Sequence, residues 1–205
     1  MMIASLIPTY VYTEMTPNPN SMKFVADRLV ILEDQVAEFV SADQVKGNSE
    51  LAARLFTFPF VKNVFIMANF VTVTKDADSD WDLIKHEVRE FIQRHLMEHR
   101  LAVVEGFQGL HLSEENVADT PLAQHKVGSE LEQKIADLLD EYVRPAVEKD
   151  GGAIQLDSFS NGVVKVVLRG SCSGCPSSAV TLKSGIENLL KSMLPEVQEV
   201  VALEA

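Results

Sequence analysis

The residues with the clearest chemical potential are two cysteines that lie close together near the C-terminus. They are the only cysteines among 205 residues and share one four-residue window, Cys172-Ser173-Gly174-Cys175. Pro176 follows, and apolar residues at helical spacing begin after it, so we expect the pair at a strand-to-helix junction. Free N–H groups and the dipole of a first helical turn favour a thiolate there. Since two cysteines cannot form a disulfide framework, the pair predicts redox or metal chemistry.

Three kinds of site use such a pair. A thiol–disulfide oxidoreductase has the same local placement, but a thioredoxin-type arrangement continues through more elements than the one helix and one strand expected here. A structural zinc site needs four closed ligands, and no second Cys or His pair lies at a recognisable spacing from Cys172. An iron–sulfur cluster is held by four thiolates, so two chains contributing two each would complete one across a dimer axis. The residues favour this third hypothesis and leave the other two open.

The elements around the cysteines predict an α-β-β-α-β domain. A helix is expected from residue 129, with one face marked by Leu131, Ile135, Leu138, Leu139 and Tyr142. The Asp150-Gly151-Gly152 turn stops it, and backbone freedom alone explains both glycines. Strands over 153–159 and 162–168 meet at Asn161-Gly162, a strong hairpin signal. A long helix from Pro176 and a strand over 197–203 complete the domain.

The N-terminal half predicts a second small α+β unit. Strand-like segments flank a dense turn signal at 16–20, and two apolar runs meet as a hairpin at Ala68-Asn69. Ser49 can cap a short helix, and Ser79 or Asp80 can cap a longer one. Residues 105–127 show no sustained periodicity and are interpreted as a linker. We therefore predict domains at 1–104 and 128–205, each of the α+β class.

The charge and the N-terminal residues exclude several functions. Acidic residues outnumber basic ones by 30 to 18, which gives a net charge of −12 and disfavours nucleic-acid binding. No apolar run approaches the length of a membrane span, and the first dozen residues lack the features of a signal peptide. From these observations we expect a cytoplasmic protein without nucleic-acid or membrane partners.

The segment from His95 to His99 matches the His-x-x-Glu-His signature of inverted zinc peptidases. At helical spacing, however, His95 and His99 share a face with Ile84, Val88 and Ile92. Near a helix C-terminus imidazole is favoured in any case. We therefore interpret the two histidines as the end of a packing stripe.

Several motifs together resemble a known family. Residues 148–152 (Glu-Lys-Asp-Gly-Gly), 170–178 (Gly-Ser-Cys-Ser-Gly-Cys-Pro-Ser-Ser), 181–186 and 194–197 look like the C-terminal domain of NifU-type proteins. Thr16 to Asn20, Lys23-Phe24, residues 70–75 and Trp81 are similar to the N-terminal domain of Nfu iron–sulfur cluster carriers. The resemblance covers nearly the whole chain outside the linker, and the order of motifs in the C-terminal part is specific.

The resemblance implies a carrier without catalytic residues, in which Cys172 and Cys175 of two subunits bind a [4Fe–4S] cluster. It further implies a homodimer on cluster binding, an upstream assembly scaffold that donates the cluster, and apo iron–sulfur client proteins that receive it. A thiol–disulfide oxidoreductase using the same pair is the alternative. One departure from the family pattern is Ala153, because the position after Asp-Gly-Gly is often acidic.

Overall fold

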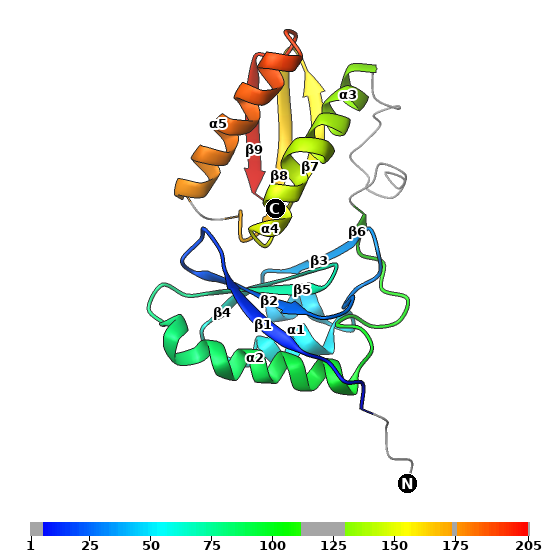
Figure 1. The fold of residues 1–205 in the computed structure, drawn as a ribbon, viewed down its shortest axis with the longest axis vertical. Helices are drawn as coiled ribbons and strands as arrows, with labels where there is room; N and C mark the ends of the chain where they lie inside the picture. Colours follow the sequence, from blue (N-terminus) through cyan, green and yellow to red (C-terminus); the bar gives the residue numbers. More distant parts are fainter. Residues whose placement is uncertain (1–5, 112–129, 174–175, 205) are drawn as a thin grey trace. The chain divides into compact units, whose positions relative to one another are not determined.

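The structure, a computed structural model, describes residues 6–111, 130–173 and 176–204. The chain divides into two compact units, Met1–His111 and Leu112–Ala205. Both combine helices with a small sheet (Figure 1), which confirms the predicted α+β class. The division falls inside the segment 105–127 that the sequence analysis assigned to a linker.

The N-terminal unit is built on a six-stranded antiparallel sheet. Its spatial order is β1 (Val11–Met15), β2 (Ser21–Ala26), β5 (Phe70–Lys75), β4 (Val61–Met67), β3 (Gln35–Phe39) and β6 (Leu110–His111). The predicted hairpin between β4 and β5 is confirmed, with Ala68 at a φ of 46° in its turn. The turn before β2 is closed by Thr16 Oγ1, which donates to the carbonyl oxygen of Asn18 at 2.9 Å.

Helices cover one face of this sheet (Figure 1). A short 3₁₀ turn, η1 (Ala42–Val45), precedes α1 (Glu50–Leu55) and α2 (Trp81–Glu98). Ser49 Oγ caps α1 by accepting from the Ala52 N–H, and Asp80 caps α2 by accepting from the Asp82 N–H. Both caps agree with the sequence prediction. The buried apolar residues of the two helices are Leu51, Ala52, Leu55, Trp81, Val88, Ile92 and Leu96.

Two strands of this sheet are absent from the sequence prediction. β3 has only a short, mixed pattern of apolar and polar residues, and β6 consists of two residues inside the predicted linker. Each is defined by its pairing: β3 pairs with β4 along one edge and with β6 along the other. The part of the predicted linker at 112–127 lies outside the described residues.

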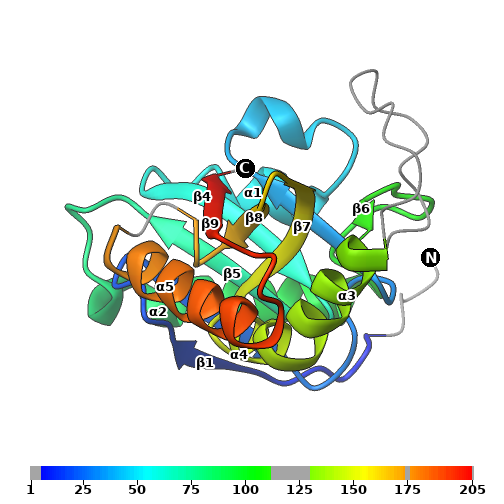
Figure 2. The same cartoon turned by 90° about the horizontal axis from the view of Figure 1, so that it is seen from above.

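The C-terminal unit has the predicted α-β-β-α-β order. Its elements are α3 (Glu130–Leu138), the π-helical segment η3 (Leu139–Val143), α4 (Arg144–Lys149), β7 (Gly152–Ser160), β8 (Val163–Gly170), α5 (Pro176–Met193) and β9 (Glu199–Glu204). β8 is central, antiparallel to β7 and parallel to β9. Figure 2 shows the helices on one face of this sheet. The turn between β7 and β8 has positive φ at both Asn161 and Gly162, as the Asn-Gly signal requires.

The last turns of the first helix in this unit bury a different face from the one that the sequence predicts. The N–H of Arg144 bonds to the carbonyl oxygen of Leu139, five residues back, which identifies a π-turn. The extra residue shifts the phase of the buried stripe, so Val143 is buried while Tyr142 is half exposed. Pro145 has no N–H and conflicts with regular helical bonding, which gives a physical reason for the wider turn.

Candidate functional site

The cysteine loop connects β8 to α5. Cys172 lies in this loop and is 6% exposed, packed within the apolar core of the C-terminal unit. Cys175 lies outside the described residues. Pro176 is the first residue of α5, so the cysteine window occupies the predicted strand-to-helix junction.

The Asp150-Gly151-Gly152 turn ends α4 and begins β7. The N–H of Asp150 bonds to the carbonyl oxygen of Ala146 at 3.1 Å, and that of Gly151 bonds to the carbonyl oxygen of Glu148 at 3.0 Å. Gly151 has a φ of 81°, where a glycine is favoured. The predicted helix stop is therefore confirmed.

Hydrogen bonds from Ser171 join the cysteine loop to this turn. The Ser171 N–H donates to the carbonyl oxygen of Gly151 at 3.2 Å, and its hydroxyl donates to the carbonyl oxygen of Asp150. Ser171 is buried, and its Oγ lies 3.9 Å from the Sγ of Cys172. The residue before the cysteine thus holds the loop against a turn that lies some twenty residues earlier in the chain.

Gly152 has a role that the sequence analysis missed. It pairs with Gly170 across β7 and β8, next to the cysteine loop. A β-carbon at position 152 would stand 2.5 Å from the carbonyl oxygen of Arg169 and 3.0 Å from the Sγ of Cys172. Backbone freedom explains Gly151, but Gly152 is required because a side chain there would collide with the loop. Counting outward from the Asn161-Gly162 turn brings position 152 close to position 170, but the irregularity between Leu156 and Ser158 shifts the register by one residue, so the pairing itself comes from the structure.

Arg169 lies three residues before Cys172 in the chain. Arg169, at the end of β8, is half-buried and pairs with the buried Ala153 of β7. A thiol is a soft ligand suited to iron, zinc or copper. Within the described residues, no three His, Cys, Asp or Glu side chains form a group that could hold a metal ion.

The histidines of the His-x-x-Glu-His segment lie at the end of α2. His95 is 3% exposed and packs on the face that carries Val88 and Ile92, as predicted. His99 is exposed, so the prediction that it also belongs to the packing stripe is wrong. Its ring stacks on that of His95 with centroids 4.3 Å apart. Burial, followed by the nearby His99, lowers the pKa of His95 to about 4, so the ring is neutral at pH 7. His99 Nε2 lies 4.0 Å from Glu50 Oε2.

Among the helices formed by the described residues, none combines the length and the apolar character needed to cross a bilayer.

Comparison with known proteins assigns both halves of the chain. The fold and the cysteine loop define an α+β protein with a NifU-like domain, and residues 135–201 match the family model "NifU-like domain". Residues 11–99 match "Scaffold protein Nfu/NifU N terminal". The chain belongs to the Nfu/NifU family of iron–sulfur cluster scaffold proteins, which confirms the resemblance seen in the sequence.

Similar curated proteins come from fruit flies. The chain is 39% identical over 191 residues to a Drosophila ananassae protein named "NFU1 iron-sulfur cluster scaffold homolog, mitochondrial", covering 93% of this chain and 63% of that protein. It is 38% identical over 200 residues to the Drosophila willistoni protein of the same name, covering 98% and 65%. The chain thus spans slightly less than two thirds of the length of these relatives.

Among solved structures, a NifU-like protein from Saccharomyces cerevisiae aligns with a TM-score of 0.43 and 26% identity. The alignment covers 50% of this chain and 89% of that protein. At this TM-score the structural likeness adds nothing to the family assignment.

The cytoplasmic location expected from the sequence is wrong by this comparison, because both relatives are named as mitochondrial proteins. That expectation rested on the lack of signal-peptide features and of a membrane span. Neither property distinguishes the cytoplasm from other reducing compartments.

Proposed function

We propose that this chain is a non-catalytic carrier that binds a [4Fe–4S] cluster between Cys172 and Cys175 of two subunits and transfers it to apo client proteins. The observation that carries the proposal is the position of Cys172, in a loop tied by Ser171 to the Asp-Gly-Gly turn of a NifU-like domain. Such a loop supplies thiolates at a helix start, where negative charge is stabilised.

The ligand count supports a site shared between two chains. A [4Fe–4S] cluster takes four thiolates, and the chain has two cysteines, so a second copy supplies the remaining pair. A cluster held by two ligands from each subunit is easier to release than one enclosed in a single fold. This difference favours a carrier that forms a homodimer when it is loaded.

Cluster binding has to bring Cys172 to the surface. In this structure its side chain is 6% exposed and lies against the space that Gly152 leaves open. A sulfur in that position cannot reach a ligand shared with another chain, so we infer that the loop turns Sγ outward when the cluster binds.

Transfer proceeds by ligand exchange. Thiolates of an apo client replace Cys172 and Cys175 one at a time, and the iron–sulfur unit moves from the shared site to a closed four-ligand site. The same replacement in reverse loads the carrier from an upstream assembly scaffold. The competing oxidoreductase hypothesis uses the same two thiols but requires a disulfide between them during turnover.

Anaerobic reconstitution with iron and sulfide tests the proposal. The full chain should become brown, absorb broadly near 400 nm and hold about four irons per two chains. Cys172→Ser and Cys175→Ser should each abolish the colour, whereas Ser173→Ala, a change in the same loop, should keep it. Size-exclusion chromatography should show a dimer that returns towards monomer after chelation. A colourless wild type that reduces disulfides with turnover would establish the oxidoreductase instead.

Transfer needs its own assay. The loaded carrier is mixed with an apo protein that has four cysteine ligands, in the presence of a chelator too large to enter a protein-protein complex. We expect the client to gain its cluster faster than from free iron and sulfide at the same concentration. Equal rates would show that iron leaves the carrier before the client takes it up.

A further inference from the structure

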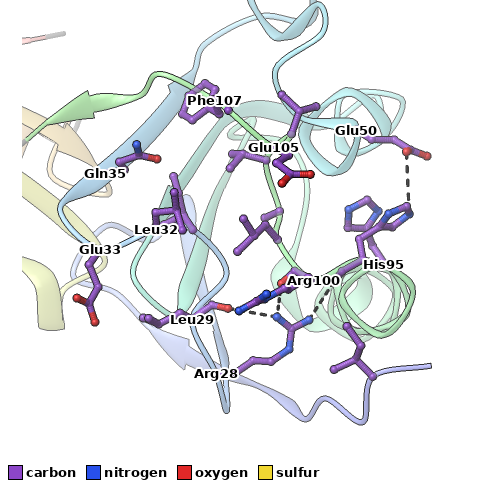
Figure 3. Close-up of a pocket in the computed structure, with 18 residues that line it drawn as sticks. Arg28, Leu29, Leu32, Glu33, Gln35, Glu50, His95, Arg100, Glu105 and Phe107 are labelled. Carbon is purple, nitrogen blue, oxygen red and sulfur yellow. Dashed lines mark hydrogen bonds and ion pairs between the residues drawn. The ribbon is translucent and has the colours of Figure 1, made fainter. Parts of the chain in front are cut away.

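We draw no further inference here: the strongest candidate, the cavity of the N-terminal unit that Gln35 and His95 help to line (Figure 3), carries nothing because its acidic and basic side chains nearly balance and nothing in the described part of the structure shows what occupies it.

Discussion

Gly152 lies so close to Cys172 that a β-carbon on the glycine would stand 3.0 Å from the cysteine sulfur. The same β-carbon would be 2.5 Å from the backbone oxygen of Arg169, which cannot move without disturbing β8. The Asp-Gly-Gly turn is therefore part of the wall of the cysteine site. Substitutions at this turn should therefore change iron binding at Cys172 as well as the stability of the fold.

Gly152→Ala should destabilise the protein by about 1–3 kcal/mol, because the added methyl group must displace backbone. It should also reduce the iron bound on reconstitution. Urea unfolding and iron analysis measure the two effects. Gly185→Ala is the matched control: nothing lies within 4 Å of its added β-carbon, and the site is inside α5. That change should stabilise by up to about 1 kcal/mol. If Gly152→Ala and Gly185→Ala were equally stable, the close approach of position 152 to Arg169 and Cys172 would be contradicted.

Ser171→Ala removes the hydroxyl that donates to the Asp150 carbonyl oxygen. This part-buried carbonyl oxygen loses a partner, and we expect a loss of about 1 kcal/mol in the free energy of unfolding. A loosened loop should also release its cluster to a chelator faster, which loss of absorbance near 400 nm would follow. Ser192→Ala, which removes an exposed hydroxyl bonded within α5, should leave the release rate unchanged. Identical release rates for Ser171→Ala and the wild type would show that Ser171 does not hold the loop.

Cys172 should react slowly with alkylating reagents in the cluster-free protein, because its side chain is 6% exposed. The measurement uses Cys175→Ser, so that one thiol remains, and compares the folded chain with the same chain in denaturant. We expect the folded protein to react at least tenfold more slowly. A rate equal to that of the unfolded chain would mean that Sγ is already outward without a cluster.

The stability of the N-terminal unit should fall between pH 6.5 and pH 4. The pKa of His95 is lowered from 6.5 to about 4 by burial and by His99, with Arg54 acting in the same direction and Glu50 opposing them. In this window the unfolded chain binds more protons at this site than the folded chain does, so lower pH favours unfolding. The contribution is fully present above pH 6.5 and declines by up to about 1.4 kcal/mol per pH unit.

Urea unfolding of His95→Phe at pH 7 and pH 5 measures that contribution. The variant should lose less stability than the wild type between the two values. His86→Gln changes an exposed histidine on the same helix and should leave the pH dependence as it is in the wild type. An unchanged slope in His95→Phe would show that His95 is not the group responsible.

Local signals predicted the elements that depend on local chemistry. The Asn161-Gly162 turn, the caps at Ser49 and Asp80 and the start of α5 at Pro176 all follow from backbone preferences that act within a few residues. β3 and β6 were missed because their stability comes from pairing with distant strands. The burial of Val143 in place of Tyr142 depends on a single π-turn that helical periodicity does not include.

The sequence by itself determined the α+β class, the family and the chemistry available to the chain: two thiols in one loop and no other cysteine. Residue types and their spacing are sufficient to predict these properties, because metal ligation and helix starts depend on atoms that are close together in the chain. Tertiary structure alone decided that Cys172 is packed against Gly152, that Ser171 joins the loop to the turn, and that Gln35 and His95 line one pocket. These contacts join residues far apart in sequence, and only the folded packing of strands and helices places their atoms together.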